Sequence, residues 1–271
     1  MLDVVVVTTF PAQYWHDGVA KQMLSSLADR WPAHTRKIAF VRDDLRSTIG
    51  AVAGVEIMDL DDRSSSLMKF IRTFSPAIKP LVSYGGRYEY RWDVASFAFK
   101  IAALDAARAL LDKSYVGYLV WLDSDVLTTA DIPSDILCQF LPEDVDCTCL
   151  VRAKYGPECG FVGYNFARRG RAFLDRLVGY YQERPNGTYP VFELKEWHDS
   201  YVFGEVLHEG RFRFLNLAAG TTEKHCWPQT PLSAFMSHLK GPERKRRKED
   251  LPDSVILKEP DRVKEPLRPA T

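Results

Sequence analysis

The sequence predicts an α/β protein in which helices cover a mostly parallel β-sheet. Short runs of consecutive apolar, β-branched residues recur along the chain, as expected for parallel strands that are buried on both faces. Segments with apolar residues at helical spacing stand between these runs, and this alternation is typical of α/β sandwiches. An apolar fraction of 46% over 271 residues is sufficient for a large core.

The first part of the chain supplies three expected strands and one helix. Residues 4–10 (VVVVTTF) are a continuous apolar run and are predicted to form the first buried strand. Residues 36–41 (RKIAFV) and 55–60 (VEIMDL) are the next two expected strands. Residues 18–30 have the pattern of a helix between the first strand and the second.

The middle of the chain predicts a long helix at residues 91–111. This segment contains no Gly or Pro, and Val94, Phe97, Ile101 and Leu104 recur at helical spacing. The later expected elements are a strand at 116–123 (VGYLVWLD), a strand at 146–151 (DCTCLV), and helices at 168–183 and 199–207.

The C-terminal segment differs in composition from the rest. Residues 1–241 are expected to form the folded domain, and residues 242–271 a charged, proline-containing tail that is extended or partly disordered. Arg244, Lys245, Arg246, Arg247 and Lys248 form a basic run. The run is interpreted either as a solvated tail or as a local contact for a polyanionic acceptor.

Composition excludes several classes of function. Lys+Arg and Asp+Glu number 36 each, and the resulting zero net charge disfavours a protein whose main role is to hold nucleic acid. No stretch approaches the ~20 apolar residues of a membrane span, and the apolar N-terminal run lacks the basic region of a secretory signal. Five cysteines without zinc-site spacing favour reduced thiols, and we expect a cytoplasmic location.

Two carboxylates stand at the end of the strand expected at 116–123. Asp123 and Asp125 flank the small Ser124, and ligands of open α/β sheets bind beyond the carboxyl ends of strands. Carboxylates held together there repel one another and lose hydration, so they require a cation, and oxygen ligands favour Mg²⁺ or Mn²⁺. The alternative is a turn in which one aspartate caps the next helix.

This segment carries a resemblance to a known family. VWLDSDVL (residues 120–127) resembles the D-x-D segment of the GT-A superfamily of nucleotide-sugar glycosyltransferases, especially the retaining, family 8-like enzymes. The preceding residues 97–119, and then ECGFVGYN (158–165), WHDSYVF (197–203) and SHLKG (237–241), resemble further family elements in family order. The resemblance implies a GT-A type, Rossmann-like α/β/α sandwich and a UDP-sugar donor.

The resemblance also implies a metal centre. Asp125 is the expected main ligand, Asp123 contacts the metal or the ribose, and His238 completes the coordination. An imidazole ligand favours Mn²⁺ over Mg²⁺. A metal and nearby cations stabilise the charge of a leaving diphosphate, with which Lys240 is expected to pair. If the resemblance to the family is left aside, His238 is interpreted as a capping histidine or as a histidine packed at the surface.

Further residues are expected to bind the donor. The resemblance places the base near Thr8, Thr9 and Phe10, and the donor sugar and phosphates near one side of the helix at 91–111, which carries Asp93 and Lys100. For that helix side the alternative is a solvated face with an intrahelical charge pair. The complete set expected for donor and nucleotide is Thr8, Thr9, Phe10, Asp93, Lys100, Asp123, Ser124, Lys240 and Gly241.

The acceptor-side residues are expected to be Gly160, Phe161, Trp197, His198 and Asp199. Glycine lets the backbone approach a sugar and aromatic faces suit carbohydrate CH groups, although structural turn glycines are an equal alternative. Asp199 either caps a helix or faces the substrate. In an inverting enzyme it is the natural general base, and in a retaining enzyme it positions groups. The C-terminal His-x-Lys-Gly element favours retention, and Asp123, Asp199 and Lys100 are the predicted catalytic residues.

The sequence therefore favours a metal-dependent glycosyltransferase of the hexosyltransferase type. Its acceptor is a hydroxyl group of a glycan, a lipopolysaccharide or another molecule, a hydroxylated DNA base included. One alternative is a sugar nucleotidyltransferase, although TTFPAQYW lacks the glycine-rich loop expected after the first strand. The other is an inactive, glycosyltransferase-like binding or scaffold protein. The oligomeric state is left open.

Overall fold

The computed structural model describes residues 2–42, 45–61, 63, 65–82, 88–240 and 262–263. The strands among them are β1 (Val4–Thr9), β2 (Arg36–Val41), β3 (Glu56–Asp59), β4 (Tyr118–Leu122), β5 (Val126–Thr128), β6 (Cys147–Arg152), β7 (Gly156–Asn165), β8 (Phe214–Asn216), β9 (Met236–His238) and β10 (Arg262–Val263). The α-helices are α1 (Ala12–His16), α2 (Val19–Arg30), α3 (Leu45–Ile49), α4 (Ser65–Val82), α5 (Val94–Leu110), α6 (Ser134–Phe140), α7 (Gly170–Gly179) and α8 (Asp199–His208). Short 3₁₀ helices are η2 (Tyr90–Trp92), η3 (Pro190–Glu193), η4 (Trp227–Gln229) and η5 (Pro231–Ala234).

The central sheet confirms the predicted fold class. In the described part of the chain its strand order is β10-β8-β6-β7-β4-β1-β2-β3, while β5 and β9 pair separately. β3, β2, β1 and β4 run parallel to one another, β7 runs antiparallel to both β4 and β6, and β6 is parallel to β8. Among the described strands of this sheet, only β7 and β10 therefore run in the reverse direction. As a result, the amino end of β7 lies at the same sheet edge as the carboxyl ends of β1 and β4.

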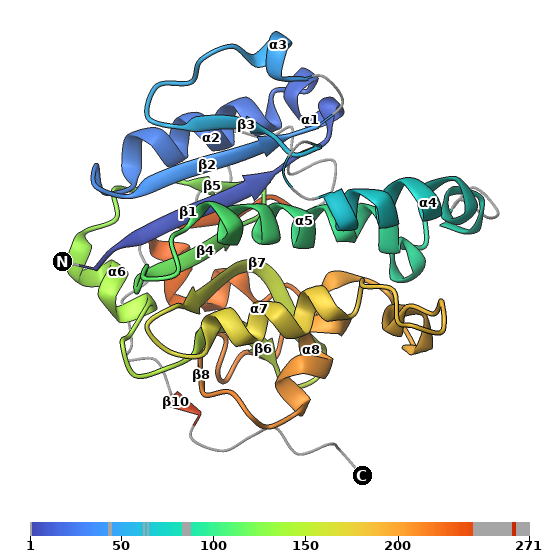
Figure 1. The fold of residues 1–271 in the computed structure, drawn as a ribbon. Coiled ribbons are helices and arrows are strands. Elements are labelled where there is room, and N and C mark those ends of the chain that lie inside the picture. The colour runs from blue at the N-terminus through green and yellow to red at the C-terminus, as the bar shows by residue number, and fades with distance from the viewer. Residues whose placement is uncertain are drawn as a thin grey trace.

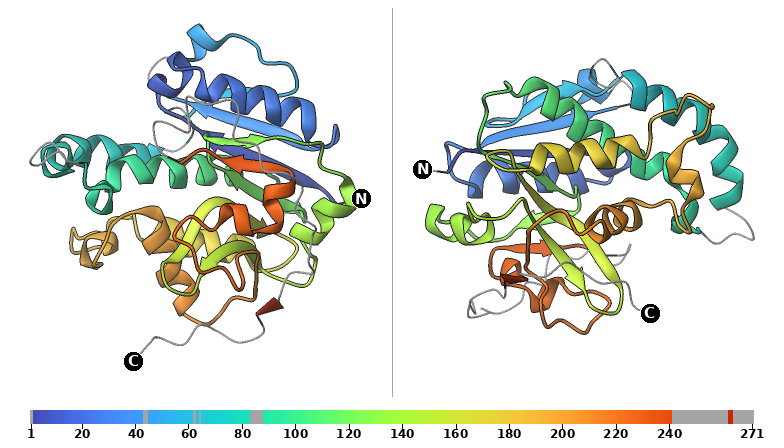
Figure 2. Two further views of the ribbon diagram at one scale, coloured as in Figure 1. Left: turned by 180° about the vertical axis from the view of Figure 1, so that it is seen from behind. Right: turned by 60° about the horizontal axis from the view of Figure 1, so that its bottom comes forward.

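Apolar side chains fill a core on each face of this sheet. In β1, Val5 and Val7 join one core while Val4 and Val6 join the other, because successive side chains of a strand point to opposite faces. The first core lies under α4, α5, α7 and α8, of which α5 and α7 cross the front of the sheet in Figure 1. The second lies under α2, α6 and the β5–β9 pair, seen from behind in Figure 2.

The start of α5 differs from the prediction. The helix begins at Val94, not at residue 91, because Asp93 is its N-cap and accepts a hydrogen bond from the Ser96 backbone N–H at 3.1 Å. The residues just before it form η2. Asp93 therefore lies just before the first turn of α5, where its carboxylate caps the helix, and a face shared with Lys100 stays a prediction.

Helix α4 was not among the elements expected from the sequence pattern. The helix contains Pro76, which lacks a backbone donor and normally interrupts a helix interior. Leu67, Phe70, Ile71 and Ile78 nevertheless bury one face of α4 in the core that it shares with α5. Tertiary packing thus outweighs the local preference of the proline.

Several predictions concern the end of the chain. Gly241, the basic run from Arg244 to Lys248, and the rest of the predicted 242–271 tail lie outside the described residues, apart from β10, whose backbone pairs antiparallel with β8. The domain boundary at 241 stays a prediction. None of the helices in the described ranges combines the length and apolarity that a bilayer crossing needs. All five cysteines are free thiols.

Asp146, just before β6, provides a test of the fold away from the candidate site. Its side chain is 3% exposed and accepts hydrogen bonds from the backbone N–H groups of Arg169 (3.2 Å) and Arg213 (2.8 Å). Asp146→Asn turns one acceptor oxygen into a donor, so the free energy of unfolding in urea should fall by about 2 kcal/mol.

The matched control is Asp131→Asn. Asp131 is 84% exposed and pairs with Arg30 at 3.3 Å, so its loss should cost less than about 0.5 kcal/mol. Equal destabilisation by the two variants would contradict the structural role given to Asp146.

Candidate functional site

The two D-x-D carboxylates lie just beyond the carboxyl end of β4. The Asp123 backbone N–H donates to the Gly160 carbonyl at 2.9 Å, so pairing with β7 continues one residue past the strand. The Asp123 carboxylate also accepts a hydrogen bond from the Trp121 indole at 2.6 Å. Both aspartates lie in the short connection from β4 to β5, where the sequence places them. This is the edge of a parallel sheet at which ligands usually bind.

The β5–β9 pair brings His238 to these carboxylates. Val126 of β5 pairs with His238 of β9, and the Leu239 backbone N–H donates to the Asp125 carbonyl at 2.9 Å. The His238 Nε2 atom lies 3.1 Å from Asp125 Oδ1 and 3.8 Å from Asp123 Oδ2. One ligand atom from each of the three residues falls within 4.8 Å of the others. The predicted metal ligands therefore meet.

Glu158 is a further carboxylate at this centre, and the sequence prediction gave it no role. It lies near the amino end of β7, which the reversed strand direction brings to the D-x-D edge. Glu158 Oε2 lies 3.3 Å from His238 Nδ1, and Oε1 lies 3.6 Å from Lys240 Nζ. Oε1 also accepts a hydrogen bond from the Gly160 N–H at 3.0 Å. Its only sequence signal is its position at the start of the 158–165 motif.

The charges around His238 are strongly coupled. Burial by itself would raise the pKa of Glu158, but the charges of His238 and Lys240 outweigh burial and hold that pKa well below its usual range. Burial would likewise lower the pKa of His238, but Glu158 and Asp125 raise it to about 9, against the opposing charge of Lys240. When no cation is bound, the imidazole is therefore protonated and lies between two carboxylates.

Lys100 of α5 connects the D-x-D to Asp199. Its ammonium lies 3.0 Å from Asp123 Oδ1, forms an ion pair with Asp199 Oδ2, and donates to the Cys159 carbonyl at 2.9 Å. Burial opposes the charge, but the two aspartates outweigh it and raise the pKa of Lys100 above its usual range. The three residues predicted to be catalytic thus form one ion-paired group.

The start of α8 differs from the helix-capping alternative for Asp199. The N-cap is His198, whose Nδ1 accepts the Tyr201 N–H at 3.4 Å while Nε2 contacts Glu196 Oε2 at 2.8 Å. Asp199 stands in the first turn, where negative charge is favourable. Its carboxylate is only 7% exposed and contacts Lys100.

Aromatic rings gather beside the predicted acceptor-side residues. The Trp197 backbone N–H donates to the Arg91 carbonyl at 2.7 Å, and the Trp197 and Trp92 ring centroids are 5.2 Å apart. The Tyr90 ring lies 5.3 Å from that of His198. Tyr90 and Trp92 are both exposed. Apolar ring surface is therefore open to solvent next to Trp197 and His198.

Some predicted site residues are less accessible than the sequence suggested. Thr8 and Phe10 are fully buried, and the Phe10 ring stacks on Trp15 at 6.3 Å, so it packs in the core and does not face a base. Thr9 remains slightly exposed. Phe161 is also fully buried, so its ring offers no face to a sugar.

Two predicted donor residues are buried, and one of them, Asp93, has structural contacts. The Asp93 carboxylate caps α5 and accepts a hydrogen bond from the Tyr88 hydroxyl at 2.7 Å. Ser124 is buried between the two D-x-D carboxylates. Their contacts with a donor stay predictions.

Gly160 has a packing role next to His238. A Cβ at this position would lie 2.7 Å from the His238 ring and 3.0 Å from the Trp227 ring, which packs edge-on against His238 at 5.0 Å. Real Cβ atoms do not approach other atoms so closely, so the imidazole occupies space that only glycine leaves free.

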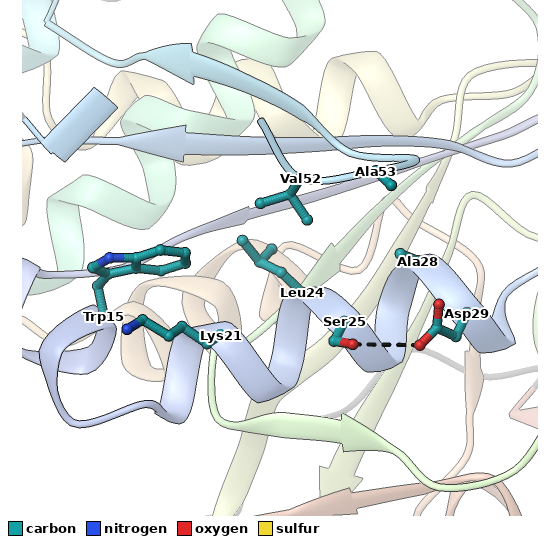
Figure 3. A pocket seen from close by; sticks show the side chains of 8 residues that line it. All are labelled: Trp15, Lys21, Leu24, Ser25, Ala28, Asp29, Val52 and Ala53. Atoms are coloured by element: carbon teal, nitrogen blue, oxygen red, sulfur yellow. Dashed lines mark hydrogen bonds between the residues drawn. The ribbon is translucent and has the colours of Figure 1, made fainter. Parts of the chain in front are cut away.

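A cavity of about 300 Å³ lies elsewhere, between α2 and the segment that follows α3. Figure 3 shows Trp15, Lys21 and Leu24 on one side and Val52 opposite. The Ser25 hydroxyl donates to Asp29 within it at 3.3 Å. None of the predicted site residues lines this cavity, so it is separate from the candidate centre.

The donor set at the D-x-D fits a divalent cation. Two carboxylates and one imidazole supply ligand atoms, a combination that suits Mn²⁺ and related ions. The surrounding ion-paired group consists of four carboxylates, two lysines and His238. With a neutral imidazole this group carries an excess of two negative charges, which one divalent ion balances.

No family model and no curated protein matches the chain. Among solved structures, it is similar to the apo form of mouse xyloside xylosyltransferase 1, with a TM-score of 0.44 and 14% identity over 86% of this chain and 91% of that one. It is also similar to the apo form of the glycosyltransferase GlyE of Streptococcus pneumoniae TIGR4 (TM-score 0.43, 15% identity, 79% of this chain and 45% of that one). A third is the WbbM bifunctional glycosyltransferase (0.41, 14%, 76% and 37%). The chain spans less than half of the last two proteins, and at these TM-scores the likenesses assign no activity.

The packing at Gly160 generates a prediction. Gly160→Ala should displace the His238 ring and weaken Mn²⁺ binding by about tenfold, measured by electron paramagnetic resonance of free Mn²⁺. The control is Gly179→Ala at the end of α7, where a Cβ meets no atom within 4 Å. Wild-type Mn²⁺ affinity in Gly160→Ala would show that the ring position does not matter.

Proposed function

We propose that the chain is a metal-dependent glycosyltransferase that moves a sugar from a nucleoside-diphosphate donor, a UDP-sugar, to a hydroxyl acceptor. One observation carries the proposal: ligand atoms of Asp123, Asp125 and His238 converge within 4.8 Å at the carboxyl edge of a mostly parallel sheet. Two lysines stand beside them. A diphosphate leaving group needs this combination of a divalent cation and fixed positive charge.

Asp123, Asp125 and His238 would hold the ion, for which the imidazole favours Mn²⁺ over Mg²⁺. When bound, the ion neutralises charge that develops on the leaving diphosphate. Lys240 adds a second positive charge. Its side chain is 46% exposed and lies 3.6 Å from Glu158, so the ammonium can turn towards a diphosphate at the edge of the site.

Lys100 and Asp199 are proposed to order the site next to Asp123. The Lys100 ammonium holds Asp123 and Asp199 in fixed positions, since a buried charge keeps its partners. One Asp199 oxygen is already paired and the carboxylate is 7% exposed, which suits positioning better than proton abstraction. We therefore favour retention, in which the acceptor hydroxyl gives its proton to the leaving phosphate oxygen on the same face.

The acceptor is proposed to approach over Trp197 and His198. Tyr90 and Trp92 add exposed ring faces at this place, and such faces pack well against the CH groups of a sugar. An acceptor hydroxyl carried by a carbohydrate fits this surface best. The cytoplasmic location and a contact between the basic run and a polyanionic acceptor stay predictions.

The proposal is tested first with donors alone. The protein is incubated with a panel of nucleotide sugars and Mn²⁺, and release of the nucleoside diphosphate is measured. Slow, Mn²⁺-dependent hydrolysis of one UDP-sugar is the expected result, because water can replace an absent acceptor. Absence of both hydrolysis and Mn²⁺-dependent nucleotide binding for every donor would refute the proposal.

Asp125→Asn tests the ligand assignment. Removing the charged oxygen should weaken Mn²⁺-dependent UDP binding by more than about 100-fold in isothermal titration calorimetry. Asp135→Asn, an exposed carboxylate at the start of α6, is the control and should bind like the wild type. Unchanged binding in Asp125→Asn would exclude Asp125 as a ligand.

Lys240→Ala tests the diphosphate contact. Loss of one charge-assisted contact should weaken UDP binding in the presence of Mn²⁺ by about tenfold. Binding of Mn²⁺ without nucleotide should not weaken by a similar factor, because Lys240 supplies none of the converging ligand atoms. The exposed Lys224→Ala is the control. An equal loss of UDP affinity in both variants would reduce the effect to general surface charge.

A further inference from the structure

Two buried polar atoms of the centre face one another. His238 Nδ1 and Glu158 Oε2 are 3.3 Å apart, and their side chains are 0% and 7% exposed. Within the described part of the chain, neither atom has another hydrogen-bond partner. Buried polar atoms are nearly always paired, so each of these two atoms is the natural partner of the other.

The surroundings leave the imidazole little freedom. Gly160 lies against one part of the ring and Trp227 packs edge-on against it. What this packing does not decide is whether Nε2 or the ring carbon Cε1 faces the D-x-D, because a flipped imidazole has almost the same shape. Glu158 does decide it, since only one of the two orientations directs a ring N–H at its carboxylate.

The second carboxylate oxygen of Glu158 also has positively polarised partners. Oε1 accepts the Gly160 N–H at 3.0 Å and lies 3.6 Å from the Lys240 ammonium. Both oxygens therefore face donors, which is the arrangement of an ionised carboxylate. Glu158 is not itself in the group of residues whose ligand atoms converge.

We infer that Glu158 is a positioning residue: it accepts the Nδ1–H of His238 and so directs Nε2 towards the cation held by Asp123 and Asp125. The inference rests on the proposed metal site. A histidine that ligates a metal through one nitrogen commonly donates its other N–H to a carboxylate, which fixes the tautomer and makes the ligand more basic. The same carboxylate lies 3.6 Å from the Lys240 ammonium, so one buried group contacts both His238, the last residue of β9, and Lys240 just after it.

Direct Mn²⁺ binding by the 271-residue chain tests the inference without any sugar donor. Glu158→Gln keeps the size of the side chain but cannot accept hydrogen bonds from both His238 and Gly160. Mn²⁺ affinity should fall by about 10- to 100-fold. The ¹⁴N modulation that a coordinated imidazole produces in the electron spin echo of bound Mn²⁺ should weaken or disappear.

Glu158→Asp separates contact from charge. It keeps the negative charge but withdraws the oxygens by about 1.5 Å. A positioning role predicts loss of Mn²⁺ affinity and of the ¹⁴N modulation here as well, whereas a role as a nearby charge predicts neither. This variant also provides the test should Glu158→Gln fail to fold.

Asp146→Asn is the matched control, because it neutralises another buried carboxylate that accepts backbone N–H groups, away from the centre. It should bind Mn²⁺ as the wild type does, with full ¹⁴N modulation. Wild-type affinity and modulation in the Glu158 variants would overturn the inference and leave the proposed function intact. A wild-type chain that binds no Mn²⁺ would overturn the metal site, and the inference with it.

Discussion

The geometry of the centre depends on the buried ammonium group of Lys100. It joins the end of β4 through Asp123, the start of α8 through Asp199, and β7 through the Cys159 carbonyl. These elements come from separate parts of the chain. An isolated buried charge is strongly unfavourable, so this lysine and its two carboxylates are stable only together. The ion pair therefore stabilises the same arrangement that the proposed chemistry needs.

The reversed direction of β7 explains how several carboxylates gather at one edge. A parallel strand would present its last residues there, whereas β7 presents its first, including Glu158. The β5–β9 pair then adds His238 from the end of the folded chain. Mutual repulsion among the acidic groups is reduced, but not cancelled, by two lysines and the imidazole. The zero net charge of the chain thus conceals a local concentration of both signs.

Local pattern was sufficient for the D-x-D and for the five strands that are apolar runs, β1, β2, β3, β4 and β6. A continuous apolar run such as β1 or β4 is typical of a central strand that is buried on both faces. The two carboxylates directly after β4 mark the end of that strand. Pattern failed where tertiary packing opposed it. Helix α4 was not expected, because it contains Pro76. Helix α5 begins three residues later than expected, because Asp93 is its N-cap. Phe10 and Phe161 were expected to contact substrate, but both are core residues. A short motif does not indicate whether its aromatic side chain is buried.

The sequence by itself determined the alternation of strands and helices, the α/β class, and the chemical types available for a metal centre, because these follow from neighbours within a few positions. Only the tertiary structure decided which groups meet. His238 reaches Asp125 across 113 residues, and Glu158 faces His238 because β7 is antiparallel to β4. Such contacts depend on strand order and direction, which are set by burial of the whole sheet and not by any local run of residues.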